Sequence, residues 1–486
     1  MRKGWMALIL VLAAAVAAGA DTIILKSGRR ISATEVREEG DRVVYETPAG
    51  HMSLPKSIVD HVERGPSATY ASGGASASPA AAAAAMVGTP PPVATDSSFD
   101  DIVKAVLAGG SIDRNYLLKL DGDAQAGGKL PVERMAVGHH VAAQFELHKG
   151  DLDQAVNQYR RALTFAPDHT GLLVNLAAVQ IRGSQFTQAA DSLERAKRIA
   201  PRDFDVAKYL GIAYFGASKL DQAVEEWKRA LELRSDPDLQ RKLDVVQRRQ
   251  REEANYREGR SAHFQVRYSG AAAPASLVTE LLRTLESHFS AIESTLNYTP
   301  PEPISVVLYT NQAFTDVTGA PDWVAAETDA RFAHISVPTQ GLAGMNSDLS
   351  RTLKHELTHA FIAQKTRSRC PSWLHEGMAQ WMEGVRAGDH AGEWVALYDK
   401  EKRTIPLAAL EGDWMIFTGD QAREAYSWAI SVIEYIITTD GMGDIERILD
   451  HMATEPPEDA VHGVLRMDYS ELQEETIKYL RKTYIR

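Results

Sequence analysis

Apolar residues recur at every fourth position between residues 349 and 361, at Leu349, Leu353, Leu357 and Phe361. This spacing places them on one face of a helix, and no Gly or Pro interrupts the stretch. Asn346 and Ser347 stand just before it and are typical residues of a helix N-terminus. The pattern therefore predicts a capped helix with a buried apolar stripe.

The segments around this helix carry both strand and helix patterns. Strand patterns occupy residues 264–268, 304–309 and 332–337. Helical patterns occupy residues 278–296, 421–438, 443–451, 460–465 and 469–484. Strands that alternate with helices and then give way to helices alone are typical of an α+β domain. We assign residues 249–486 to this domain.

A period of 34 residues runs through the helical region at 99–248. It relates Ala155 to Ala189 and Ala223, Ala162 to Ala196 and Ala230, and Pro167 to Pro201. Tyr159, Leu193 and Trp227 occupy one bulky position in this register. The pattern resembles tetratricopeptide repeats, in which helix pairs stack into an all-α solenoid. The resemblance implies a concave groove that binds a protein or peptide partner.

The first 98 residues predict three further segments. Residues 1–20 combine Arg2 and Lys3 with an apolar run and an Ala-Gly-Ala end, the pattern of a signal peptide. Residues 21–64 alternate as about five short strands and resemble the small SH3-like modules of exported bacterial proteins. Residues 65–98 have the Ala, Ser, Pro and Gly content of a flexible linker. We therefore expect a multidomain chain that is exported to a bacterial periplasm or exterior.

Composition narrows the possible partners. A net charge of −12 gives no general basic surface, so we expect no nucleic acid. No stretch of about 20 apolar residues follows the signal region, so we expect no membrane span in the mature chain. Cys370 is the only cysteine and cannot form an internal disulfide.

The helix around residues 349–361 carries the sequence His355-Glu356-Leu357-Thr358-His359. His355 and His359 are one turn apart on the same face, which suits two imidazole nitrogens on one metal ion. Glu356 is rotated from His355 by about 100°, so it can act on a water molecule as general base rather than bind the metal. A catalytic zinc usually takes three protein ligands, so a third must come from elsewhere.

Glu376 is the candidate for the third ligand. It lies in a second predicted helix, which opens at Pro371-Ser372 and contains Trp373-Leu374-His375-Glu376-Gly377. The two segments together resemble the gluzincin zinc peptidases with a thermolysin-like fold, in particular the peptidase MA-like domains. The resemblance implies that His355, His359 and Glu376 bind Zn²⁺ and that Glu356 is the general base.

The same resemblance assigns roles to Tyr426 and to one strand, and the spacing from Glu376 suggests a role for Glu383. Tyr426 corresponds to the tyrosine that stabilises the oxyanion in related gluzincins, although a tyrosine packed on a helix is the alternative. Glu383 stands two turns after Glu376 and is expected either to hydrogen-bond a ligand histidine or to be a surface carboxylate. The strand at 332–337 would be the edge that pairs with an extended substrate.

These features predict an exported zinc metallopeptidase whose repeats recruit a protein partner or substrate. We favour an endopeptidase, because Ala343-Gly344-Met345-Asn346 lacks the glutamate of the Gly-Ala-Met-Glu-Asn motif of related aminopeptidases. The alternative is a repeat scaffold whose protease-like domain has lost activity, although such proteins usually lack a ligand or the base. A cell-wall amidase is a third interpretation, since the same chemistry cleaves any amide.

Overall fold

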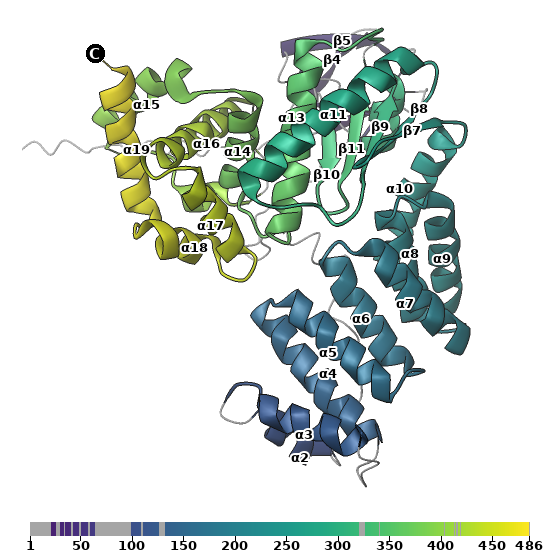
Figure 1. The fold of residues 1–486 in the computed structure, drawn as a ribbon. Helices are drawn as coiled ribbons and strands as arrows, with labels where there is room; N and C mark the ends of the chain where they lie inside the picture. Colours follow the sequence, from purple (N-terminus) through teal and green to yellow (C-terminus); the bar gives the residue numbers. More distant parts are fainter. Residues whose placement is uncertain are drawn as a thin grey trace, which may run out of the picture. The chain divides into compact units, whose positions relative to one another are not determined.

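The computed structural model describes most of the chain beyond residue 98 and short segments before it. The described residues are 21–25, 30–33, 35–39, 42–47, 50–56, 59–63, 99–107, 110–125, 132–319, 326–339, 341–402, 404–412, 414, 417 and 419–485. They belong to two compact units, of which the first holds the N-terminal strands and the second most of the chain from residue 99 onwards (Figure 1). The predicted signal peptide and linker lie outside the described residues.

The N-terminal region has six strands among its described residues, where the sequence predicts about five. They are β1 (Asp21–Leu25), β2 (Arg30–Ala33), β3 (Glu35–Glu39), β4 (Arg42–Thr47), β5 (Gly50–Pro55) and β6 (Val59–Glu63). They form two antiparallel sheets, ordered β2-β1-β6 and β3-β4-β5. The strands expected here are therefore present, while the SH3-like class of the module stays a prediction.

The region expected to contain repeats is a stack of helices. They are α2 (Asp100–Val106), α3 (Arg114–Gln125), α4 (Val132–Lys149), α5 (Leu152–Phe165), α6 (Thr170–Arg182), α7 (Phe186–Ile199), α8 (Phe204–Gly216), α9 (Leu220–Leu233) and α10 (Pro237–Glu253). Helices α4 to α9 pack as successive pairs (Figure 1). The six alanines of the 34-residue period are fully buried, which lets neighbouring helices approach closely. Gly211 also allows a close helix contact, because a Cβ at this position would lie 2.2 Å from the Trp227 ring.

The sheet of the second unit has a parallel centre and antiparallel edges. Its strands are β7 (Arg257–Arg260), β8 (Phe264–Tyr268), β9 (Ile304–Tyr309), β10 (Glu327–Asp329) and β11 (His334–Pro338), in the order β10-β11-β9-β8-β7. Strands β9 and β11 are buried along their whole length, as expected of parallel strands covered on both faces. The prediction that residues 332–337 form an edge is therefore wrong. The edge strand is β10, which pairs antiparallel with β11.

Helices cover this sheet and form a C-terminal lobe. They are α11 (Ala275–Leu296), α12 (Asn311–Thr318), α13 (Ser347–Lys365), α14 (Ser372–Glu383), α15 (Ala391–Glu401), α16 (Gly419–Thr439), α17 (Met442–Met452), α18 (Pro457–Leu465) and α19 (Tyr469–Tyr484). Helix α13 packs against α11, α14, β10 and β11, so it lies where the sheet meets the lobe. Among the described residues, no helix combines the length and apolar content needed to cross a bilayer.

The solenoid and the sheet share a core. Phe332, between β10 and β11, packs among the aromatic rings of the solenoid, 5.5 Å from Phe186 and 4.9 Å from Phe215 between ring centroids. Buried Glu253 of α10 accepts hydrogen bonds from Arg249 at 2.7 Å and from the Tyr309 hydroxyl of β9. The last helix of the solenoid is therefore joined to the sheet by apolar packing and by a buried charge network.

Candidate metal centre

Helix α13 presents His355 and His359 because its opposite side is fixed in the core. The Asn346 side chain caps the helix by accepting a hydrogen bond from the Leu349 amide at 2.8 Å. Leu349 is buried, and the other three residues of the predicted apolar stripe have no exposed surface. The two imidazole rings stand almost perpendicular, at 86°, with their centroids 4.7 Å apart. This packing leaves the histidine pair facing α14.

Helix α14 brings Glu376 to this pair. Trp373, Leu374 and Met378 are fully buried and anchor the helix. A Cβ on Gly377 would lie 2.6 Å from Ile433 Cγ1 and 2.8 Å from the Ala429 carbonyl oxygen, so α14 reaches α16 only because residue 377 is glycine. The position of Glu376 thus follows from close packing between α14 and α16.

Three potential ligand atoms converge between α13 and α14. Glu376 Oε2 lies 3.5 Å from His355 Nε2 and 3.4 Å from His359 Nε2. All three atoms lie within 4.8 Å of one another. The structure therefore brings His355, His359 and Glu376 together, as the two sequence segments predicted.

The donor set fits a divalent cation. Glu376 Oε2 is buried and, among the described residues, accepts no hydrogen bond of normal geometry, although such an atom usually has a partner. Burial raises the pKa of Glu376, but the positive charges of His359 and His355 hold it well below its usual range. Two imidazole nitrogens and one ionised carboxylate are ligands that zinc prefers.

Glu383 and His375 support the two histidines from the outside. Glu383 Oε1 lies 3.3 Å from His355 Nδ1, which orients the ring and leaves Nε2 for the centre. Burial lowers the pKa of His355, but Glu376 and Glu383 raise it to about 10. The His375 ring stacks on His359 with 4.4 Å between centroids. The sequence analysis gave His375 no role, and only the packing of the two helices reveals this contact.

Glu356 is held beside the centre by a residue that sequence reasoning missed. The Thr328 hydroxyl, on edge strand β10, donates a hydrogen bond to Glu356 Oε2 at 2.6 Å. The Glu356 side chain is almost fully buried, with 9% of its surface exposed. Thr328 comes 28 residues before Glu356, and no sequence motif connects them. The hydrogen bond fixes the carboxylate at the edge of the sheet.

Tyr426 approaches the centre from α16. Its ring stands edge-on to Trp414 at 5.0 Å between centroids, and 38% of its surface is exposed. Burial, and then the negative charges of Glu376 and Glu356, raise the pKa of Tyr426 above its usual value. Among the described residues, its hydroxyl has no hydrogen-bond partner. Tyr426 is therefore a neutral phenol within electrostatic reach of both glutamates.

Comparison with known proteins identifies the helical region. A family model described as "Tetratricopeptide repeat" matches residues 146–210. The solenoid contains tetratricopeptide repeats. Among solved structures, the chain is similar to "MamA RS-1 ArsTM double mutant", with 22% sequence identity and a TM-score of 0.26 over 32% of this chain and 84% of that chain. A search of curated proteins found no match.

We predict that changing Glu383 to Gln weakens zinc binding without unfolding the protein. The amide keeps the size of the side chain but removes the negative charge that holds His355, and loss of such a contact typically costs about 10–100-fold in metal affinity. The measurement is a competition titration of the metal-free protein with a chromophoric zinc chelator.

Glu393→Gln is the matched control, because Glu393 also pairs with a histidine, His390 at 3.8 Å, but is exposed and lies on a different helix, α15. Equal zinc affinity in Glu383→Gln and the unmodified protein would remove the supporting role of Glu383.

Proposed function

We propose that this chain is an exported zinc metallopeptidase that cleaves peptide bonds within a protein chain. The observation that carries the proposal is the convergence of His355, His359 and Glu376, with the Glu356 carboxylate beside them. The resemblance of both segments to gluzincins supports the same function. The tetratricopeptide repeats indicate protein binding, and we propose that they recruit the substrate or a partner.

The side chains around the centre have separable roles in the proposed reaction. Zinc held by the two histidines and Glu376 would supply Lewis acidity, which makes a water molecule acidic and polarises a carbonyl group. Glu356 takes the proton from this water and then delivers it to the leaving amine. Thr328 holds the Glu356 carboxylate in position through its hydrogen bond. Tyr426 donates its phenolic proton in a hydrogen bond to the carbonyl oxygen as negative charge develops there.

Strand β10 is the edge that an extended substrate would use. It pairs with β11 on one side, and among the described strands none pairs with its other side. Because Thr328 of β10 touches Glu356, a chain added to this edge passes the general base. An outer side with no partner strand among the described residues suits a polypeptide that continues in both directions, which favours endopeptidase action.

Two alternative functions differ from the proposed endopeptidase. An inactive repeat scaffold would bind partners through the solenoid and hydrolyse nothing, whereas the convergence of three potential ligands near Glu356 supports an enzyme. A cell-wall amidase would use the same residues on another amide, with the N-terminal β module binding wall material. The predicted signal peptide agrees with either enzyme, since both act in the periplasm or outside the cell.

We predict that Glu356→Gln keeps zinc and loses hydrolysis. Glutamine preserves the shape of the side chain but cannot accept the proton, and general-base catalysis typically contributes about 10²–10⁴-fold. The measurement compares kcat/KM on an unstructured protein such as casein, together with zinc content by mass spectrometry. Asp348→Asn on the same helix is the control, because Asp348 is exposed and pairs only with Arg351 at 2.9 Å.

An unchanged rate of casein hydrolysis in Glu356→Gln, or a protein that binds no zinc, would overturn the proposal. Cleavage of peptidoglycan stems without cleavage of casein would favour the amidase instead.

We predict that Tyr426→Phe lowers kcat with little change in KM. The phenylalanine keeps the packing against Trp414 but cannot donate a hydrogen bond to the oxyanion. Removal of one such donor typically costs about 10²–10³-fold in kcat. Steady-state kinetics on a fluorogenic peptide provide the measurement, and a purified variant as fast as the unmodified protein would exclude the role.

A further inference from the structure

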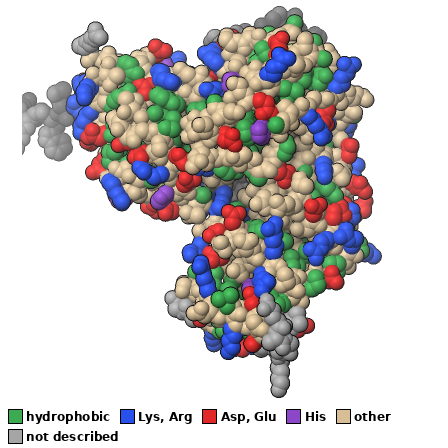
Figure 2. Space-filling view, in the orientation of Figure 1, with side chains coloured by type: hydrophobic (Ala, Val, Ile, Leu, Met, Phe, Trp, Pro, Cys, Tyr) green, Lys and Arg blue, Asp and Glu red, His purple; other side chains and the backbone are tan. Residues whose placement is uncertain are grey.

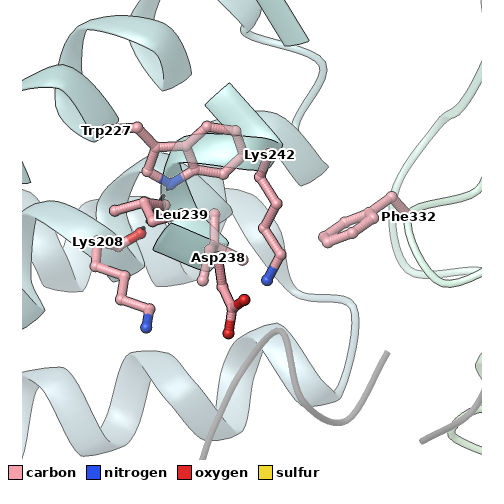
Figure 3. A pocket seen from close by; sticks show the side chains of 7 residues that line it. Lys208, Trp227, Asp238, Leu239, Lys242 and Phe332 are labelled. Atoms are coloured by element: carbon pink, nitrogen blue, oxygen red, sulfur yellow. Dashed lines mark hydrogen bonds between the residues drawn. The ribbon is translucent and has the colours of Figure 1, made fainter. Parts of the chain in front are cut away.

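A small recess lies where the solenoid meets the sheet. Lys208 of α8, Trp227 of α9, Asp238 and Lys242 of α10, and Phe332 between β10 and β11 contribute to its walls (Figure 3). Its volume of about 40 Å³ is enough for a carboxylate or a few water molecules. In Figure 3 the side chains of Lys208, Asp238 and Lys242 extend to the same side of the Trp227 ring.

The recess contains a cation without a partner. Lys208 forms an ion pair with Asp236 at 3.0 Å, and Asp238 pairs with Arg241. Lys242 is half-buried and, among the described residues, has neither an ion pair nor a hydrogen bond. Burial, and then the positive charge of Lys208, lowers the pKa of Lys242, while Asp238 and Asp236 oppose this shift. A bound negative charge would stabilise the charged form of the Lys242 ammonium group.

Arg331 extends this positive surface towards the edge strand. Its guanidinium lies 5.7 Å from the centroid of the Phe332 ring, and its Nη1 atom is buried without a hydrogen-bond partner among the described residues. Burial lowers the pKa of Arg331 to about 10, the negative charge of Asp329 opposes this shift, and the positive charge of Arg182 adds to it. The positive charge of Arg331 also lowers the pKa of Lys242. Arg331 and Lys242 are therefore close enough to repel each other.

The positive surface leads to the candidate active site. Arg331 comes two residues after Asp329, where β10 ends, and Thr328 on that strand contacts Glu356. An extended chain covers about 3.3 Å per residue, so a polypeptide held at Arg331 reaches Thr328 within a few residues. The recess is therefore placed to hold one part of a chain while another part lies along β10.

We propose that Lys242 and Arg331, both beside Phe332, form a binding surface for an acidic polypeptide segment, which delivers that polypeptide to the edge of β10. Carboxylates of Asp or Glu side chains match the size of the recess and the unpaired cations around it. The proposed binding of the acidic segment depends only on the recess and its cations. The delivery of the segment to β10 depends in addition on the proposed peptidase function.

A peptide fits this surface better than a nucleic acid does. Single-stranded nucleic acids bind through bases that stack on exposed aromatic rings, whereas Trp227 and Phe332 have exposed fractions of only 1% and 3%. Figure 2 shows Lys and Arg side chains interspersed with Asp and Glu over the visible face. With a net charge of −12, the protein repels a long polyanion but accepts a short acidic segment at a local basic surface.

The test measures binding in full-length protein that carries Glu356→Gln, so that hydrolysis does not consume the probe. Fluorescein-labelled octaglutamate is titrated at low salt and followed by fluorescence anisotropy. We expect saturable binding, a Kd raised about tenfold or more by Lys242→Glu and by Arg331→Glu, and a loss of affinity as salt increases. Lys242→Gln should weaken binding in the same direction but less, and circular dichroism verifies that each variant is folded.

Lys228→Glu is the matched control, because Lys228 is an exposed lysine on neighbouring helix α9 and outside the recess. The proposal is overturned if octaglutamate does not bind, if Lys228→Glu weakens it as much as Lys242→Glu does, or if the recess variants leave its Kd unchanged. Tighter binding of an eight-nucleotide oligothymidylate with the same dependence on Lys242 would also overturn it, in favour of nucleic acid.

The outcome is separable from that of the proposed function. Octaglutamate binding that depends on Lys242, in a protein that binds no zinc, would support the recess and refute the peptidase. Casein hydrolysis without octaglutamate binding would support the peptidase and refute the binding surface.

Discussion

The candidate centre depends on the close packing of α14 between α13 and α16. Gly377 lets α14 approach α16 to a distance that any side chain would prevent, and the adjacent Glu376 is thereby directed at the two histidines of α13. A buried carboxylate oxygen without a hydrogen-bond donor is costly unless something positive compensates it. Without a metal the two histidines compensate the Glu376 charge, and a divalent cation held by all three side chains would take over that role.

The joint between the solenoid and the sheet gives the repeats a direct mechanical connection to the centre. Phe332 belongs to the aromatic core of the solenoid, yet it follows β10, whose Thr328 holds Glu356. His334 of β11 lies 3.0 Å from the Ser218 hydroxyl at the end of the α8–α9 pair. The repeats and the strand that contacts Glu356 therefore belong to one packed core.

The parts of the site that follow from local periodicity could be predicted from the sequence. His355 and His359 share a helix face because they are four residues apart, and the glycine after Glu376 marks a close helix contact. Contacts between distant segments could not be predicted, since nothing in the sequence joins Thr328 to Glu356 or Lys242 to Arg331. The edge strand was misplaced for a similar reason. Phe332 is apolar because it packs into the solenoid, whereas the true edge, Glu327–Asp329, is short and polar and carries no strand pattern.

X-ray absorption spectroscopy at the zinc edge, on protein purified without added metal and then loaded with one equivalent of zinc, tests the central claim most directly. We expect two imidazole nitrogens and one or two oxygens at about 2.0–2.2 Å from the zinc, and the loss of one imidazole in His359→Ala. A shell that contains sulfur, or one made of oxygen alone, would contradict it, because Cys370 or surface carboxylates would then hold the metal instead of the histidine pair.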